Sequence, residues 1–386
     1  MRGFLNEKAA NLKQGAIRAM FDRMLGKENI ISLAIGEPDF FTHPDIIDAA
    51  YKAFQAGHTH YTPNAGYLEL RRAIAKAPVT DKLGYDPQDE IIVTTGAMGA
   101  LSLVFMVVLS PGDEVILQDP VWLNYYTLIG YPGGVPVGVR TDSADGFKLH
   151  ARDIEKKITP RTKAILLNNP SNPTGAFLTA DEMREIAELA VKYDLLVISD
   201  DVYNTLIYDG QQPFSIAEFP GMRERTVVIN SFSKAFAMTG WRVGYAMGPS
   251  AIIRKMVLLQ ENMVSCVSAV AQEAARYALT RLDIAREMAK VYEEKRNFIY
   301  DGLLKIEGVK CVKPGGAFYI FPDISEINPD ADAFCIDLMD KTGVVCVPGN
   351  AFGEAGKGHI RISYANSKEN LRMALERIDD YVKKWC

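Results

Sequence analysis

The sequence predicts an α/β protein with two domains. From about residue 90 onward, short apolar runs alternate with stretches of helical periodicity, which is typical of β-α-β units and a mostly parallel sheet covered by helices on both faces. At 386 residues the chain exceeds the size at which a single core stops growing. We therefore expect a large domain with a seven-stranded sheet, joined to a smaller α+β domain.

Seven apolar runs indicate the strands of the large domain, and the stretches between them indicate its helices. The expected strands are residues 91–95, 114–118, 135–140, 163–168, 195–200, 226–230 and 243–247. The expected helices are residues 97–109, 122–130, 151–157, 180–193 and 251–260, preceded by helices at 44–54 and 68–77.

The two ends of the chain are expected to build the small domain together. We assign residues 1–40 to an N-terminal arm that packs with the small domain and contains a short strand at 30–36, residues 41–280 to the large domain, and residues 281–386 to the small domain. One long helical stretch, residues 267–304, is expected to bridge the domains. The small domain is expected to hold strands at 309–312, 317–321, 344–347 and 360–364, with helices at 332–342 and 368–384.

Composition narrows the class of protein. A formal charge of −5 and a pI near 5.7 provide no basic surface for nucleic acid or an anionic membrane. No apolar run approaches a membrane span, and charges near the N-terminus occupy positions where a signal peptide needs an apolar core, so we expect a cytoplasmic location. The five cysteines form no C-x-x-C, and His58 and His60 have no third ligand nearby, so no metal site is expected.

The stretch from Ser231 to Arg242 carries the strongest chemical signal. Lys234 follows an apolar strand and is the only charged residue between Arg225 and Arg242. Burial disfavours the ammonium form and lowers the pKa of a lysine, and a neutral amine can form a Schiff base with an aldehyde. Arg242 can bind an anion beside that amine. An aldehyde together with a phosphate describes pyridoxal 5'-phosphate (PLP). The alternative for this stretch, when it is taken alone, is a strand-to-helix corner with one snorkelling lysine and one surface arginine.

Other expected strands also deliver polar groups at their carboxyl ends, where parallel sheets bind ligands. Asp200 ends an apolar strand, and a buried carboxylate needs a cation such as a protonated pyridine nitrogen. Tyr203, three residues later, can donate to a ring oxygen. Taken alone, these two residues also fit an acidic loop that caps a helix.

Three further strand ends complete the expected site. Small residues at 95–100 leave backbone N–H groups open at a helix N-terminus, which suits an anion. Trp122 can stack on a flat heterocycle or simply pack in the core. Two Asn-Pro pairs and a glycine at 168–175 force a fixed loop that aims an asparagine. In the expected small domain, Arg361 lies within an apolar strand and needs a carboxylate, either from a substrate or from a structural salt bridge.

These motifs resemble those of the class I/II aminotransferases, PLP enzymes with the aspartate aminotransferase fold (fold type I). The resemblance runs from about residue 33 to 365. It rests on Gly-Glu-Pro-Asp-Phe at 36–40, Tyr-Thr-Pro-Asn-Ala-Gly at 61–66, Asn-Pro-Ser-Asn-Pro-Thr-Gly at 169–175, Asp200-x-x-Tyr203, Ser231-x-x-Lys234-x7-Arg242, and Arg361.

The resemblance implies a role for each matching residue. It implies that Lys234 forms the Schiff base and shuttles the proton in a ping-pong transfer from an L-amino acid to a 2-oxo acid, with Asp200 on the pyridine nitrogen and Tyr203 as a further catalytic group. The other implied roles are ring-hydroxyl contacts from Asn172 and Tyr203, stacking by Trp122, phosphate binding by Gly96, Ala97, Met98, Ser231 and Arg242, and α-carboxylate binding by Arg361 with Gly36 and Asn172. Tyr61 matches a tyrosine that reaches the neighbouring subunit's phosphate in relatives, which implies a homodimer with shared sites.

One position departs from some bacterial aspartate-specific relatives, which have a lysine where this chain has Met98. The change disfavours strict dicarboxylate specificity and leaves aspartate, alanine, aromatic and other apolar donors open. A PLP lyase or decarboxylase on the same fold is the alternative within this fold. A cofactor-sensing regulator would need a DNA-binding segment, for which residues 1–30 are too short and not basic enough.

Overall fold

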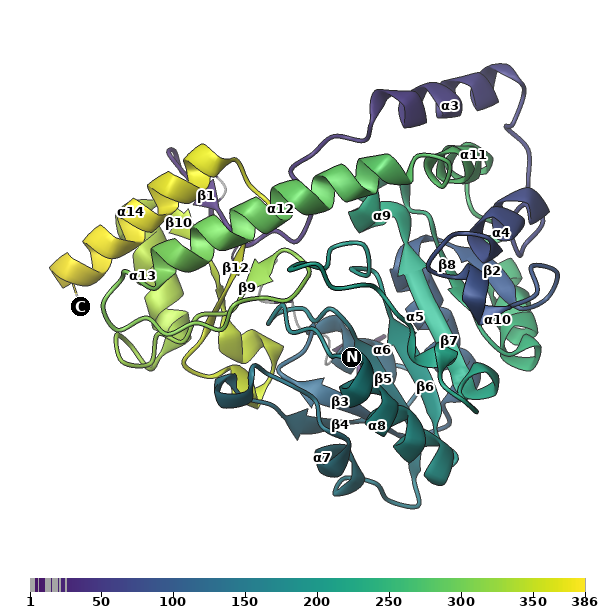
Figure 1. The fold of residues 1–386 in the computed structure, drawn as a ribbon, viewed down its shortest axis with the longest axis horizontal. Coiled ribbons are helices and arrows are strands. Elements are labelled where there is room, and N and C mark those ends of the chain that lie inside the picture. Colours follow the sequence, from purple (N-terminus) through teal and green to yellow (C-terminus); the bar gives the residue numbers. More distant parts are fainter. Residues whose placement is uncertain are drawn as a thin grey trace.

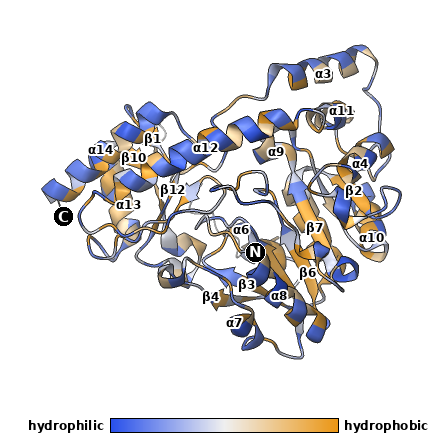
Figure 2. Ribbon diagram, in the orientation of Figure 1, coloured by the Kyte–Doolittle hydropathy of each residue, from blue (hydrophilic) through white to orange (hydrophobic). Residues whose placement is uncertain are grey.

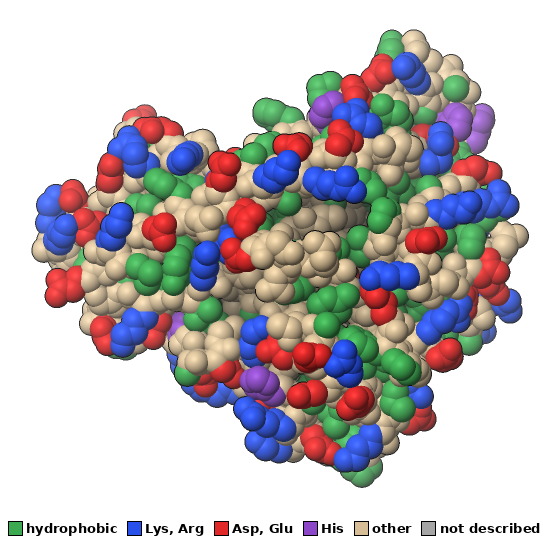
Figure 3. All heavy atoms as spheres, viewed as in Figure 1, with side chains coloured by type: hydrophobic (Ala, Val, Ile, Leu, Met, Phe, Trp, Pro, Cys, Tyr) green, Lys and Arg blue, Asp and Glu red, His purple; other side chains and the backbone are tan. Residues whose placement is uncertain are grey.

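The computed structural model describes residues 4–5, 7–10, 15, 20, 22–24 and 26–385. Most of the first 25 residues of the expected N-terminal arm therefore lie outside the described residues, apart from short pieces such as α1 (Glu7–Ala10). No helix in the described ranges is long and apolar enough to cross a membrane. Acidic and basic side chains are interspersed over the face drawn in Figure 3, without a large patch of one sign.

The large sheet has the seven strands that the sequence predicts. Their order is β2-β8-β7-β6-β5-β3-β4, and β8 alone among them runs antiparallel to its neighbours. The bounds are β2 (Ile91–Thr94), β3 (Glu114–Asp119), β4 (Val135–Arg140), β5 (Thr162–Asn168), β6 (Leu196–Asp200), β7 (Thr226–Ser231) and β8 (Gly244–Met247). The central strands are hydrophobic along their length (Figure 2), as expected for a sheet buried on both faces.

Helices cover both faces of this sheet, which confirms the predicted fold class. Alternate residues along β5 point to opposite faces, so Leu166 packs with α5 and α10, whereas Ile165 packs with α8. The helices of the large domain are α3 (Pro44–Gln55), α4 (Leu68–Ala75), α5 (Gly96–Val108), α6 (Asn124–Gly130), α7 (Ala151–Glu155), α8 (Ala180–Lys192), α9 (Phe232–Ala235) and α10 (Ser250–Val264). Short 3-10 helices occupy Asp81–Leu83, Ser143–Asp145, Ile216–Glu218, Arg223–Arg225, Thr239–Trp241, Gly349–Phe352 and Glu354–Gly356.

The expected single helical stretch at 267–304 is two helices. The chain leaves the helical conformation between α11 (Ala269–Ala278) and α12 (Leu282–Leu303), where Arg281 has φ −123° and ψ 49°. Arg281 forms ion pairs with Asp45 of α3 and with Asp283, so its side chain holds the corner in place. Only α12 then runs from the large domain into the small one (Figure 1).

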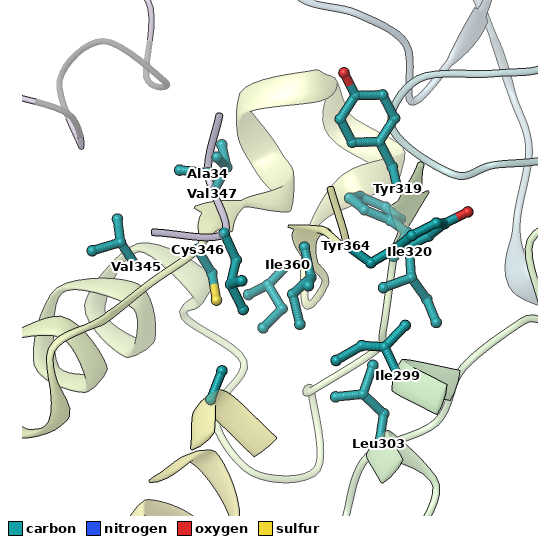
Figure 4. Close-up of a cluster of buried hydrophobic side chains, with 14 of the residues drawn as sticks. Ala34, Ile299, Leu303, Tyr319, Ile320, Val345, Cys346, Val347, Ile360 and Tyr364 are labelled. Atoms are coloured by element: carbon teal, nitrogen blue, oxygen red, sulfur yellow. The ribbon is translucent and has the colours of Figure 1, made fainter. Parts of the chain in front are cut away.

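The small domain joins segments from both ends of the chain. Strand β1 (Ile31–Ser32) pairs in parallel with β10 (Val344–Val345), and β9 (Tyr319–Ile320), β11 (Val347–Pro348) and β12 (Ile360–Ser363) form an antiparallel sheet. Helices α13 (Ala331–Thr342) and α14 (Lys368–Trp385) pack beside them. Figure 4 shows part of the shared core, to which Ala34, β9, β12 and α12 contribute apolar side chains.

Two strand predictions in this domain were wrong. The run at 309–312 forms only an isolated bridge, between Lys310 and Asp323. The run at 344–347 divides at Cys346 into β10 and β11, because each half pairs with a different partner strand. The division of the chain at residues 40 and 280 stays a prediction.

Candidate active site

A cavity of about 250 Å³ lies at the carboxyl ends of the parallel strands, beside the small domain. Among the described residues it is lined by Gly36, Ala97, Met98, Trp122, Tyr125, Asn168, Asn172, Asp200, Val202, Tyr203, Ser231, Ser233, Lys234, Thr239, Arg242, Tyr319 and Arg361. Every predicted site residue except Gly96 and Tyr61 is among them. Five loops that follow five strands therefore converge on one cavity with a residue from the Gly36 turn and one from β12.

Lys234 lies on the short helix α9, which begins directly after β7. The Ser231 side chain caps this helix by accepting a hydrogen bond from the Ser233 backbone N–H over 3.1 Å. The Lys234 ammonium donates to the Gly36 carbonyl oxygen over 2.5 Å. Burial lowers the pKa of Lys234 to about 8, although the nearby Glu37 carboxylate acts in the opposite direction. Roughly a tenth of Lys234 is therefore the free amine at pH 7, far more than for a lysine with its ordinary pKa.

Asp200 ends β6 as a buried carboxylate. Its Oδ2 accepts a hydrogen bond from the Tyr125 hydroxyl over 2.6 Å, and no ion pair to it occurs within the described part of the chain. Burial raises the pKa of Asp200 to about 6, and the Tyr125 hydrogen bond opposes that rise. A carboxylate held in this state would be stabilised by a cation placed in the cavity.

Arg242 and the start of α5 meet at one corner of the cavity. Arg242 has a left-handed backbone (φ 55°), and its Nη1 donates to the Thr239 carbonyl over 2.8 Å. A Cβ at Gly96 would lie 2.7 Å from Arg242 Nη2, so the guanidinium fits against the helix start only because residue 96 has no side chain. The N-terminal N–H groups of α5, including those of Ala97 and Met98, have no side-chain cap from Thr95. This corner combines a guanidinium with open N–H groups, which suits a phosphate.

Arg361 comes from β12 of the small domain and is only 1 % exposed. Its Nη1 donates to Asn172 Oδ1 over 3.0 Å and its Nη2 donates to the Ala34 carbonyl over 2.5 Å, while its guanidinium lies over the Tyr319 ring at 4.6 Å. Its Nε is buried without a partner among the described residues, and no carboxylate of that part of the chain pairs with it. The described residues therefore do not provide the structural salt bridge that was the alternative for Arg361. A ligand carboxylate would accept a hydrogen bond from its free Nε.

The loop after β5 places Asn172 between the two halves of the cavity. Asn168 Oδ1 accepts from the Asn172 backbone N–H over 2.8 Å, and Asn168 Nδ2 donates to the Asp200 carbonyl over 3.2 Å. The peptide bonds before Pro170 and Pro173 are both cis. The Asn172 side chain thus reaches Arg361 from a loop that is tied to the end of β6.

Several cavity residues had no clear signal in the sequence. Tyr203 shares a hydrogen bond of 2.9 Å with Tyr319, whose position inside an apolar run gave no polar signal. Tyr125 lies three residues after Trp122, on the same side of a helical turn, and that spacing was the signal that could have identified it. Asn168, Ser233 and Thr239 also line the cavity.

Tyr61 lies outside this cavity. Its side chain is 88 % exposed and borders a shallow depression that His58 and His60 also line. No group of three or more potential metal ligands occurs in the described ranges.

Comparison with known proteins identifies the relatives of this chain. The family model for aminotransferase class I and II matches residues 28–378. The chain is 40% identical to an aromatic-amino-acid aminotransferase of Thermococcus litoralis, over 98% of both chains, and 41% identical to an aspartate aminotransferase of Pyrococcus abyssi, over 95% of both. The structure of the Thermus thermophilus aspartate aminotransferase with maleate matches with a TM-score of 0.92 and 38% identity, covering 98% of this chain and 100% of that one.

Proposed function

Because the chain belongs to the class I and II aminotransferases, which use PLP to move amino groups from amino acids to 2-oxo acids by a ping-pong mechanism, we propose that the cavity at Lys234 holds this cofactor. The observation that carries the proposal is the convergence of Lys234, Asp200 and Arg242 on one cavity. Each supplies the group that one part of PLP needs: an amine for the aldehyde, a carboxylate for the pyridine nitrogen, and a guanidinium for the phosphate.

The residues present fit the cofactor. Asp200 is a buried carboxylate that lacks a cation among the described residues, and a pyridinium would supply one. Gly96 leaves room for the Arg242 guanidinium beside the open N–H groups of α5, where a phosphate would bind. Trp122 stands edge-on to Tyr125, with ring centroids 5.2 Å apart, and its own ring borders the cavity where the heterocycle would stack.

We assign the remaining contacts as follows. Ala97, Met98, Ser231 and Arg242 would hold the phosphate, and Asn172 with Tyr203 would bond the ring hydroxyl. Arg361, with Gly36 and Asn172, would bind the substrate α-carboxylate. The unpaired Arg361 Nε supports this last assignment, because a bidentate carboxylate satisfies two guanidinium donors at once.

Lys234 is proposed to carry the proton in the reaction. Bound PLP supplies an electron-withdrawing ring that makes the substrate Cα–H bond acidic. Lys234 Nζ, as the free amine, would remove that proton and deliver it to the carbon of the cofactor that carried the aldehyde. Asp200 keeps the ring nitrogen protonated, and Arg361 holds the α-carboxylate so that the Cα–H bond faces Lys234. The lowered pKa of Lys234 suits this work near neutral pH.

The cavity favours donors with an apolar or aromatic side chain. Its described lining contains three cationic residues, Lys234, Arg242 and Arg361, and the assignments above use all of them. Met98 lines the cavity where some aspartate-specific relatives have a lysine, so no lining cation of the described residues remains for a second carboxylate. The named relatives include both aromatic and aspartate aminotransferases, so the family alone does not decide the donor.

A half-reaction assay tests the proposal. PLP-loaded protein is mixed with phenylalanine, methionine, alanine or aspartate, and the visible absorption is followed until a 2-oxo acid restores it. We expect bleaching fastest with phenylalanine or methionine, and none with Lys234→Ala, whereas Lys255→Ala on the exposed side of α10 should behave as wild type. Aspartate reacting more than about tenfold faster than the others would overturn the donor assignment. PLP uptake without reaction by any donor would instead favour the lyase or decarboxylase.

We further propose that the protein works as a homodimer in the cytoplasm. Helix α3 and the loops beside it expose Phe41, Tyr51, Phe54 and Tyr61, of which Phe41 is 97 % exposed. A second copy would cover these rings and bring Tyr61 to its partner's phosphate site. Light scattering on the full chain should give twice the chain mass, and Tyr61→Phe should weaken PLP binding without changing that mass. A monomer at micromolar concentration would overturn the assembly.

A further inference from the structure

A second cavity, which we call the back cavity, lies on the other side of α9 from Lys234. Its volume is about 440 Å³, larger than the 250 Å³ of the cavity at Lys234. Ser231 borders both cavities, and Phe232 and Ala235 of α9, with Phe236 directly after the helix, form one wall of the back cavity. A cavity of this volume is within the usual range for small organic ligands.

One face of α12 forms the opposite wall. Leu282, Ala285, Arg286 and Ala289 follow helical spacing and all border the back cavity. This stripe begins the helix that continues into the small domain. The space between α9 and α12 is thus bounded by apolar side chains, which suit the apolar body of a ligand.

Polar groups without partners border the same space. Asn204 is only 8 % exposed, and its side-chain amide makes no hydrogen bond within the described part of the chain. The neighbouring Thr205 hydroxyl is fully buried and has no partner among the described residues. Buried hydrogen-bonding groups are nearly always satisfied, so the Thr205 hydroxyl indicates a missing polar partner, and the Asn204 amide beside it is free to bond the same group.

Arg286 is the only charged residue among the described residues that border the back cavity. Its side chain is exposed and forms no ion pair or hydrogen bond with the described residues. A guanidinium in this state prefers a carboxylate, which it can bind through two hydrogen bonds. The charged end of a ligand would therefore lie at the exposed side of the cavity and its polar end near Asn204.

We propose that the back cavity binds a small aromatic monocarboxylate with a hydroxyl group at the end opposite its carboxylate. The ring packs between α9 and α12, the carboxylate pairs with Arg286, and the hydroxyl bonds with Asn204 and Thr205. This site is separate from the α-carboxylate site at Arg361 and does not depend on the function proposed above. Because α9 separates the two cavities, the ligand contacts the helix that carries Lys234.

Binding of 3-(4-hydroxyphenyl)propionate to the PLP-loaded full chain tests this site by titration calorimetry. Because a carboxylate can also bind at Arg361, the titration is repeated on Arg361→Ala, where binding is expected to persist. Arg286→Ala should weaken that remaining binding about tenfold. Lys290→Ala, one turn further along α12, removes an exposed cation that does not border the cavity and should change binding less than about twofold.

Two further comparisons locate the ligand within the cavity. 3-Phenylpropionate, which lacks the probe's hydroxyl, should bind wild type severalfold more weakly than the probe does. In Asn204→Ala the affinities of the two ligands should differ much less. Ala289→Leu should narrow the cavity and weaken binding. If this variant does not fold, the exposed Arg286→Ala provides the test. Any of three results would overturn the proposal. These are equal affinity in Arg286→Ala and wild type, loss of all binding in Arg361→Ala, or no binding to wild type at about 10 mM probe, a concentration well above the dissociation constant expected of a built site.

Discussion

Tyr125 donates its hydroxyl hydrogen to Asp200 Oδ2 over 2.6 Å, so a neutral phenol on α6 supports the carboxylate at the end of β6. Both groups are buried, and burial raises the pKa of each. The tyrosine therefore remains a donor over the physiological pH range. It stabilises the ionised form of Asp200, the form that would hold a protonated pyridine nitrogen.

Tyr125→Phe is expected to weaken PLP binding about tenfold at pH 7. Without the phenol, the pKa of Asp200 rises above its present value of about 6, and more of the carboxylate is protonated at pH 7. Raising the pH ionises it again, so the ratio of variant to wild-type dissociation constants should narrow by pH 9. Fluorescence titration of PLP into the cofactor-free proteins measures the dissociation constants of variant and wild type at both pH values.

Tyr126→Phe is the matched control. Tyr126 is the next residue on α6, and its hydroxyl makes no hydrogen bond to Asp200. Its substitution should leave the pH dependence of PLP binding as in wild type. A pH-independent loss of binding in Tyr125→Phe would indicate a packing defect and contradict the electrostatic role.

Lys234 should react as a free amine at lower pH than the surface lysines. Burial lowers the pKa of Lys234 to about 8, whereas the hydrogen bond and charge of Asp48 raise the pKa of the exposed Lys52 above 10.5. Acetylation of the cofactor-free protein, followed by peptide mass spectrometry, should give half-maximal labelling of Lys234 near pH 8. Labelling of Lys52 should still be rising at pH 10. Parallel profiles for the two lysines would contradict the lowered pKa.

Gly96→Ala should weaken PLP binding more than tenfold, because its Cβ would lie 2.7 Å from Arg242 Nη2 and displace the guanidinium. Gly84→Ala separates this effect from backbone strain. Gly84 has φ +64°, close to the +70° of Gly96, but nothing lies within 4 Å of the point that a Cβ at residue 84 would occupy. Both variants should lose about 1 kcal/mol of stability, and only Gly96→Ala should lose cofactor affinity.

Asp201→Asn should stabilise the protein at pH 8. Asp201 is buried beside Ser199, whose hydroxyl donates to Oδ1 over 2.6 Å, and burial raises the pKa of Asp201 from 3.8 to about 7. The folded chain binds this proton more tightly than the unfolded chain, so stability falls as the pH rises from about 4 through 7. At pH 8 the buried charge destabilises the fold by roughly 2–4 kcal/mol, and a neutral asparagine removes that cost while still accepting from Ser199.

The gain in melting temperature from Asp201→Asn should therefore be large at pH 8 and small at pH 4.5. Asp113→Asn should show the opposite sign at pH 8, since the Ser110 backbone N–H and Lys163 lower the pKa of Asp113 and make its ionised form stabilising. A gain for Asp201→Asn that is equal at both pH values would contradict the buried-charge explanation.

The sequence predicted the large domain better than the small one for a physical reason. Each strand of a buried parallel sheet is a continuous apolar run, so β5 and β7 were visible within one or two residues of their bounds. Strands β10 and β11 have two residues each, and their ends are fixed by pairing with β1 and β12 rather than by local composition. The corner at Arg281 depends on Asp45, which no local pattern reveals.

The site residues also differ in how well the sequence could predict them. Lys234 and Asp200 lie at the ends of apolar strands, and that position indicated chemistry once the other strand ends were considered with them. Tyr319 became visible only as a partner in three dimensions, because a tyrosine within an apolar run has the same local pattern whether it packs in the core or borders a cavity. For Tyr125, the three-residue spacing from Trp122 was the one local signal. The back cavity had no sequence signal, since its walls come from α9, α12 and the loop at Asn204.

The pairing of β1 with β10 determines the order in which parts of the chain can fold during synthesis. Ile31 lies opposite Val344, and the Ala34 carbonyl accepts from Arg361, so residues made first wait for residues made near the end. The strands of the large sheet are complete by residue 247 and can assemble while translation continues. The part of the site proposed to bind the α-carboxylate can form only after β12 has left the ribosome. A ribosome-bound nascent chain that ends before β12 would thus present the proposed cofactor pocket without Arg361, the proposed substrate-binding arginine.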